Sequence, residues 1–249
     1  MKRLVVCAAV ALSVFTGTSQ AQLMPGVDEP FNGGFSSPSR EAPRVLQSFI
    51  DNSFLTDVTG PTVLTGLSFR LPAIANTTYP TADITFGQYS ITLAEPSSAA
   101  AAANGLTSDT FADNMSNPIV VRSGSLTIPA GSFTDNNTGP GLDPAGQENA
   151  EFSFFIPFST PYTLDAGEDL VVLLRHNGYG TPQQTSFNFD AFSYTGGGRV
   201  ATGDVNAAVS NNAIANDTVM KYAFSVVPEP SGLALLGVGA LLTLRRRRA

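Results

Sequence analysis

Short runs of β-branched, aromatic and other apolar residues alternate with turn residues from about residue 45 to residue 226. Alternating apolar and polar positions over Leu64–Leu71 and over Ile84–Leu93 have the period of a strand with one buried face. In the second run the phase shifts at Gly87-Gln88, which indicates a bulge or a bend. Leu170–Leu174 is apolar throughout and predicts a central strand covered on both faces. Further strands are expected at 119–121, 124–128, 151–157, 169–176, 187–194 and 220–226.

The segments between these runs have the composition of turns. Asn177-Gly178 favours a type I′ hairpin turn, since both residue types tolerate positive φ. The alanine-rich stretch Ser97–Asn104 is the one short helix that we expect, and residues 22–44 have no period and predict an extended arm. With no repeated unit and many glycines and prolines, residues 45–227 predict one all-β domain, a single β-sandwich of jelly-roll-like type.

The N-terminus has the three parts of a secretory signal peptide. Lys2 and Arg3 precede an apolar run from Leu4 to Phe15. Ser19-Gln20-Ala21 then fits the small-x-small cleavage pattern, so we expect residues 1–21 to be removed by a cut between Ala21 and Gln22. The alternatives are a buried N-terminal helix or a retained anchor, for which the apolar run is short.

The C-terminus, residues 228–249, has the features of a second targeting segment. A short apolar stretch over 233–244 is well below the length of a stable membrane span, and we expect it to form a short, transient membrane helix. The cluster Arg245, Arg246, Arg247 and Arg248 resists translocation, so the C-terminus stays cytoplasmic and the β domain lies on the far side of the membrane. A plain membrane anchor is the alternative.

This tail resembles the PEP-CTERM sorting signal of Gram-negative bacteria. Its parts occur in the family's order: the motif Pro228, Glu229 and Pro230, a glycine-containing apolar segment and the arginine cluster. The resemblance implies that an exosortase, a membrane-bound processing enzyme, recognises the motif and cuts near it. It further implies release or attachment at the cell surface alongside exopolysaccharide. The motif residues would then be read as substrate and would not be catalytic.

The middle of the chain, about residues 45–180, also resembles an uncharacterised β domain of tail-anchored bacterial exoproteins. The resemblance supports a β-sandwich and carries no activity. The phrases that carry it are Leu64–Arg70, Tyr89–Leu93, Thr110–Asn114, Ser123–Leu126, Phe158–Tyr162 and Leu170–Leu174.

Charge and cysteine content exclude several functions for the predicted domain. The formal net charge of the chain is −7, but residues 22–227 hold only seven basic residues against nineteen acidic ones. Such a domain repels nucleic acid and anionic lipid, so we expect no nucleic-acid partner and membrane contact only through the tail. The only cysteine is Cys7, so the mature domain has no disulfide and no thiolate metal site.

Catalytic constellations are weak in this sequence. His176 is the only histidine, and it ends an apolar strand with no Gly-x-Ser-x-Gly motif in the chain, so we interpret it as structural. Paired carboxylates could hydrolyse a glycoside, for example Glu148 with Glu151, or Asp165 with Glu168 and Asp169. The chain has no tryptophan for sugar stacking, which Tyr162, Tyr179 or Tyr194 could replace.

Calcium is the more credible ligand, because carboxylates, amide oxygens and loop carbonyls are its preferred donors. The candidate ligands are Asp135, Asn137, Asp143, Asp165, Glu168 and Asp169, in a spacing that matches no EF-hand. No other cofactor is expected.

The sequence therefore predicts a non-enzymatic, exported protein of the cell surface or extracellular space. We expect a structural or adhesive role in an exopolysaccharide matrix or biofilm, with extracellular polysaccharide as a candidate partner. A carbohydrate- or calcium-binding module is the alternative, and a carboxylate glycosidase is a third.

Overall fold

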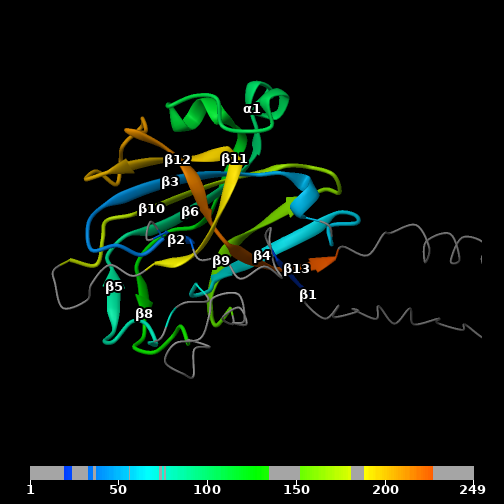
Figure 1. Ribbon diagram of the computed structural model, residues 1–249. Helices are drawn as coiled ribbons and strands as arrows, with labels where there is room; N and C mark the ends of the chain where they lie inside the picture. Colours follow the sequence, from blue (N-terminus) through cyan, green and yellow to red (C-terminus); the bar gives the residue numbers. More distant parts are fainter. Residues whose placement is uncertain are drawn as a thin grey trace, which may run out of the picture.

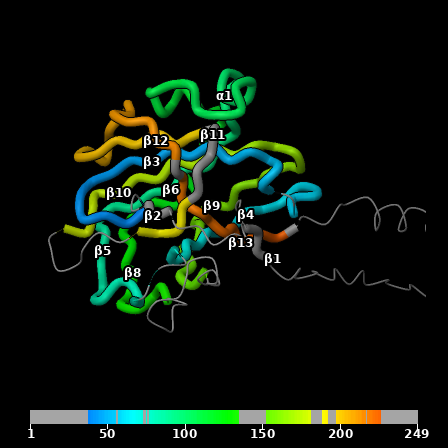
Figure 2. The backbone as a smooth tube through the Cα atoms, viewed as in Figure 1, coloured from blue at the N-terminus to red at the C-terminus, as the bar shows by residue number. Residues whose placement is uncertain are grey.

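The computed structural model describes residues 20–23, 33–35, 38–55, 57–72, 75, 77–134, 152–180 and 188–226 (Figures 1 and 2). Within these residues the chain is mostly strand, with one short α-helix and two single 3₁₀ turns. The all-β class predicted from the alternating pattern is confirmed. The predicted signal peptide before Gln20 and the tail after Val227 lie outside the described residues.

Two large sheets and one strand pair make up the described fold, and all strand pairs are antiparallel. In order across the smaller sheet, the strands are β1 (Gln20–Leu23), β13 (Met220–Val226), β4 (Thr62–Phe69) and β9 (Phe154–Leu164). In order across the larger sheet, the strands are β12 (Asn212–Thr218), β11 (Phe189–Thr202), β3 (Arg44–Ile50), β10 (Leu170–His176), β6 (Tyr89–Pro96) and β7 (Met115–Arg122). β2 (Gly33–Phe35) joins it beside β11, and β5 (Ile84–Phe86) pairs with β8 (Leu126–Ile128).

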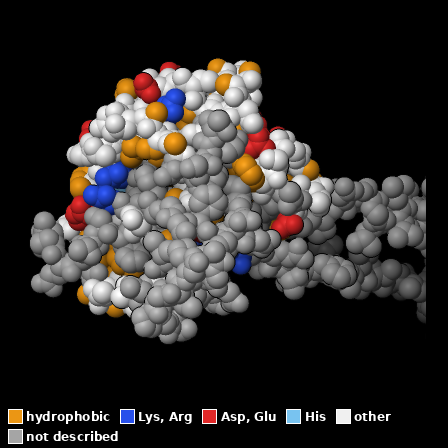
Figure 3. Space-filling view, in the orientation of Figure 1, with side chains coloured by type: hydrophobic (Ala, Val, Ile, Leu, Met, Phe, Trp, Pro, Cys, Tyr) orange, Lys and Arg blue, Asp and Glu red, His pale blue; other side chains and the backbone are white. Residues whose placement is uncertain are grey.

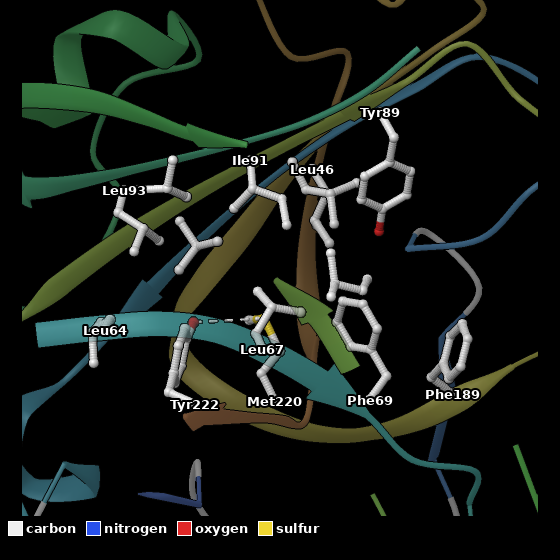
Figure 4. Packing of buried hydrophobic residues seen from close by; sticks show 14 of the residues in the cluster. Leu46, Leu64, Leu67, Phe69, Tyr89, Ile91, Leu93, Phe189, Met220 and Tyr222 are labelled. Carbon is white, nitrogen blue, oxygen red and sulfur yellow. Dashed lines mark hydrogen bonds between the residues drawn. The ribbon is translucent and has the colours of Figure 1, made fainter. Parts of the chain in front are cut away.

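One hydrophobic core lies between the two large sheets (Figure 4). Each side chain fully buried there contributes roughly 1.5–3 kcal/mol. The two sheets face each other with Leu64, Leu67, Phe69, Met220 and Tyr222 from the smaller and Leu46, Tyr89, Ile91 and Leu93 from the larger. At one side the edge strands β9 and β7 meet, where the Ser159 hydroxyl donates to the Val121 carbonyl at 3.1 Å.

The outer face of the larger sheet is also covered, by segments that we call the outer cap: residues 97–114 and 203–211. The cap contains α1 (Ser98–Ala103) and the 3₁₀ turn η2 (Phe111–Asn114), and Figure 1 shows α1 above this sheet. Phe111 packs on Val45 and Leu173, and Leu106 packs on the next part of the same face. β10 is therefore buried on both faces, which confirms the expectation from its unbroken apolar run.

The predicted short helix is confirmed, with a capped end on each side. The Ser97 hydroxyl accepts a hydrogen bond from the Ala100 amide at 3.3 Å, which is the usual N-cap arrangement. Asn104 ends the helix in the left-handed conformation with φ 50°, which asparagine tolerates better than most residues.

Of two predicted turns, one is confirmed. The chain bends at Gly87-Gln88, and the bend separates β5 from β6, which belong to different sheets. The hairpin predicted at Asn177-Gly178 is wrong, because β10 pairs with β3 and β6 and not with the next strand, β11. Gly178 has φ 77° for another reason: a Cβ there would clash with the Glu41 carbonyl oxygen, so the glycine lets the segment 38–43 pack against the end of β10.

The predicted strands are confirmed with shifted bounds, and some strands were not predicted. β9 and β11 extend well beyond the expected 151–157 and 187–194. β1, β2, β3 and β12 had no prediction as strands. The described parts of the predicted arm over 22–44 lie against both sheets, through β1 and β2.

Candidate functional site

His176 lies in the interior and is not available as a general base. Its side chain is fully buried, with its ring stacked on Tyr89 at 5.9 Å and edge-on to Phe86 at 5.0 Å. Its Nδ1 accepts a hydrogen bond from the Gly178 amide at 3.1 Å. These contacts fix the end of β10 and give His176 a structural role.

One end of the two-sheet core gathers carboxyl groups, and we call it the tail end because β13 finishes there. Val226 and Leu164 both lie beside Thr62, and Leu170 lies beside Ile50, so the loops 51–61 and 165–169 meet at this end. Its carboxyl groups are Asp51, Asp57, Glu95, Asp165, Glu168 and Asp169. The two loops contain no lysine or arginine. On the face shown in Figure 3, the visible lysine and arginine side chains lie mainly in the left half of the view.

The three predicted calcium ligands of this end are close in sequence, but two of them already accept hydrogen bonds from the protein. Asp169 Oδ1 accepts from the backbone amide and the Nδ2 of Asn52, both at 2.8 Å. Glu168 Oε2 accepts from the Asp165 amide at 3.1 Å and closes the turn between β9 and β10. These carboxylates hold loops together, whether or not an ion also binds.

Among the described residues, no three His, Cys, Asp or Glu side chains lie together in a way that could hold a metal ion. The other predicted calcium ligands, Asp135, Asn137 and Asp143, lie outside those residues, as do Glu148 and Glu151. The calcium prediction therefore stays a prediction.

The tyrosines proposed as sugar platforms differ in exposure. Tyr162 is buried, and burial together with Glu95 and Glu168 raises the pKa of its hydroxyl. Tyr179 is half-buried and packs edge-on to Phe86 at 5.6 Å. The side chain of Tyr194 lies outside the described residues. Tyr162 is thus unavailable for stacking on a sugar.

Of the two predicted processing sites, the signal cleavage site lies within the described residues and the C-terminal motif does not. Ala21 and Gln22 lie in β1, opposite Ala223 and Tyr222 of β13. β13 ends at Val226, and the motif Pro228–Pro230 and the cluster Arg245–Arg248 lie outside the described residues. In the part of the chain that is described, no helix has the length and hydrophobicity to cross a membrane.

A buried ion pair that sequence reasoning missed connects the two sheets. Arg70, directly after β4, donates from Nε to Asp190 Oδ2 of β11 at 2.7 Å, and both side chains are at most 3% exposed. Arg70 Nη2 and Asp190 Oδ1 have no hydrogen-bond partner among the described residues. Burial raises the pKa of Asp190 to about 6, although the guanidinium of Arg70 opposes this shift.

A second buried carboxyl group, Asp217 of β12, has no cationic partner among the described residues. Its Oδ1 accepts from the Ser48 hydroxyl at 2.6 Å and from the Thr218 amide at 2.8 Å. Burial raises its pKa to about 7, with these hydrogen bonds opposing the shift. Asp217 stands in the polar run Asn216-Asp217-Thr218, so nothing in the local sequence indicates that it is buried.

Comparison with models of protein families gives no match for this sequence, and comparison with curated proteins gives no significant match.

Proposed function

We propose that this protein is exported and sorted to the cell surface or the extracellular space by its C-terminal tail, and that it acts there without catalysis. The observation that carries the proposal is the tail itself: Pro-Glu-Pro, a short apolar segment and four arginines in that order. β13 ends at Val226, and only Val227 separates this last strand from Pro228. The tail therefore follows the folded domain directly, as expected for a segment that an exosortase-type enzyme reads and removes.

The folded part supports a structural or adhesive role in an extracellular matrix or biofilm. We propose that its two packed sheets form a single β-sandwich of jelly-roll-like type, since the chain crosses repeatedly between them along β3, β4, β6, β9, β10 and β13. The sandwich needs no disulfide, because one continuous core holds it together. Its partners in this proposal are the processing enzyme and extracellular polysaccharide. Contact with the inner membrane is transient and passes through the tail, whose end stays cytoplasmic.

Deleting residues 228–249 tests the sorting proposal in the native host. The full-length protein should be found at the surface or in the medium in a processed form, whereas the truncated protein should accumulate in a different fraction. Glu229→Ala should reproduce the sorting defect, because it removes the only charge in the motif. Ser231→Ala, just outside the motif, is the matched control and should sort normally. Identical fractionation of all four forms would refute the proposal.

A calcium- or carbohydrate-binding module is the second candidate, because the loops and strand ends of the tail end carry six carboxyl groups and the two loops contain no lysine or arginine. No three of the described acidic side chains group as a metal site by themselves, so a bound calcium ion would also need carbonyl or polysaccharide oxygens. A ligand at about 100 times its dissociation constant adds roughly 2.7 kcal/mol to the free energy of unfolding. A saturable rise of the melting temperature with calcium or with the host's polysaccharide would favour this candidate, and an unchanged melting temperature would argue against it.

A further inference from the structure

One strand edge in the fold is covered by the same residues that form the predicted signal cleavage site. β13 pairs along its whole length with β4 on one side. On its other side it pairs with β1, in a register that places Gln20 opposite Phe224 and Leu23 opposite Lys221 (Figure 1). Among the described residues, β1 is the only strand on this outer edge of β13.

Removal of residues 1–21 would divide β1 in the middle. Only Gln22 and Leu23 would remain, opposite Tyr222 and Lys221. Ala223 and Phe224 would lose their partners in β1, and Ser225 and Val226 have no partner in β1 even before cleavage. The outer edge of β13 from Ala223 to Val226, which we call the freed edge, would then have no strand beside it among the described residues. Such an edge is a template for pairing with another chain.

The other outermost strands of the two large sheets, β9, β7 and β12, carry features that discourage such pairing, and the freed edge does not. β9 contains Pro157 and Pro161, which lack an amide hydrogen. β7 contains Pro118, a left-handed residue at Asn117 with φ 49°, and two register irregularities against β6. β12 is rich in Asn and Asp, which are depleted in strands.

The freed edge itself consists of Ala223, Phe224, Ser225 and Val226, with no proline and no charge. The register shift between Ala223 and Phe224 against β4 comes from the extra residue Thr65 in β4, so it does not disturb β13. Ala223 and Ser225 are small and half-buried, while Phe224 points into the core. A second strand could therefore approach this edge closely.

We propose that the freed edge of β13 is an assembly site that pairs antiparallel with the freed edge of a second copy of this chain. A strand edge is self-complementary under a two-fold axis, so both copies use the same residues. The smaller sheets of two copies join into one continuous sheet through β13. In an antiparallel pair the two copies of β13 run in opposite directions, so their C-terminal ends point away from each other. Because β13 is followed directly by the tail, we expect this pairing in copies whose tails have been removed. This inference rests on the proposed export and signal cleavage.

The test uses the processed protein recovered from the outside of native host cells, with its N-terminus checked by mass spectrometry. Sedimentation over a range of concentrations should show a reversible dimer. Ser225→Lys places two like charges beside the two-fold axis and should weaken dimerisation roughly ten-fold or more. Val63→Lys is the matched control: Val63 lies opposite Ser225 in β4, one strand away from the edge, so this variant should dimerise like the wild type.

A chemical readout keeps the test decisive if a lysine variant folds poorly. The processed chain has no cysteine, because Cys7 lies in the segment removed. Ser225→Cys therefore provides a single thiol, and a short bis-maleimide should link two copies of it efficiently. Val63→Cys should link much less.

A monomer at the highest soluble concentration, equal weakening by both lysine variants, or equal linking of both cysteine variants would overturn the assembly site. An N-terminus that retains residues before Gln22 would overturn it as well, because β1 would then still cover β13. Export is read separately: Ser225→Lys should reach the same cell fraction as the wild type. A sorted monomer would refute only the assembly site, and a protein kept in the cytoplasm would refute the proposed function.

Discussion

Two buried carboxyl groups come from adjacent strands of the larger sheet, Asp190 from β11 and Asp217 from β12, and they differ in their partners. Asp190 has the guanidinium of Arg70 at 2.7 Å, which offsets the charge of its ionised carboxylate. Asp217 has only hydrogen-bond donors, from Ser48 and Thr218. An unpaired buried carboxylate is costly, which is why the pKa of Asp217 rises to about 7.

The raised pKa of Asp217 makes the free energy of unfolding fall as the pH rises. Between the ordinary pKa of 3.8 in the unfolded chain and about 7 in the folded one, the folded state holds a proton that the unfolded state has lost. Stability should therefore decrease by up to about 1.4 kcal/mol per pH unit across this window. In Asp217→Asn this slope should be lost, so that the variant gains most relative to the wild type above pH 7.

Urea unfolding of the mature wild type and of Asp217→Asn at several pH values between 5 and 8 measures this difference. The control is Asp113→Asn, an exposed carboxyl group, which should leave the wild-type slope unchanged. Parallel pH profiles for the wild type and Asp217→Asn would show that Asp217 is ionised throughout and that the account of its burial is wrong.

These residue-scale features could not be predicted from the sequence, because their partners are far away along the chain. Arg70 and Asp190 are 120 positions apart, and Ser48 and Asp217 are 169 positions apart. Local periodicity shows that a position is charged within an apolar run, but it does not show which distant donor reaches it. By contrast, a structural role for His176 was predictable from its place at the end of an apolar strand.

At the scale of elements, the outer cap is held to the larger sheet by a buried amide pair. Asn114, at the end of η2, donates from Nδ2 to Gln47 Oε1 of β3 at 2.9 Å and to the Ser108 carbonyl at 2.8 Å. Its Oδ1 accepts from the amides of Thr107 and Ser108. The side chain thus ties a cap loop to the sheet with all of its polar atoms satisfied.

Asn114→Ala should destabilise the mature protein by about 2–4 kcal/mol, because it leaves the buried Oε1 of Gln47 and two part-buried backbone amides without their hydrogen-bond partner. Urea unfolding measures the loss. Asp113→Ala is the matched control one residue away: Asp113 is exposed and bonds only the Ser108 hydroxyl, so its loss should cost under about 1 kcal/mol. Equal effects of the two substitutions would contradict the role of Asn114.

The elements that the sequence predicted are those with one buried face, a strong cap or, in β10, an unbroken apolar run. β4, β6 and β13 alternate, and α1 has Ser97 before it and Asn104 after it. β3 was missed because the outer cap buries its second face, so Gln47 and Ser48 are buried polar residues and no alternation remains. β12 was missed because its sequence is rich in asparagine and alanine. The hairpin at Asn177-Gly178 failed because the glycine serves a contact with Glu41, which lies far away in the sequence.

At the scale of the whole molecule, the all-β class followed from composition and periodicity, and the order of the strands did not. Neighbouring strands in the larger sheet, such as β3 and β10, are separated by more than 100 residues, and pairing at this range leaves no local signal. The terminal segments show the reverse, because the order of their residues is the whole argument for the proposed export and sorting.

The intact mass of the protein recovered from the outside of its native host cells tests the central claim most directly. The account predicts a chain that begins at Gln22 and ends at or near the motif Pro228–Pro230, without the four terminal arginines. A full-length chain of 249 residues found only in the cytoplasm would contradict it.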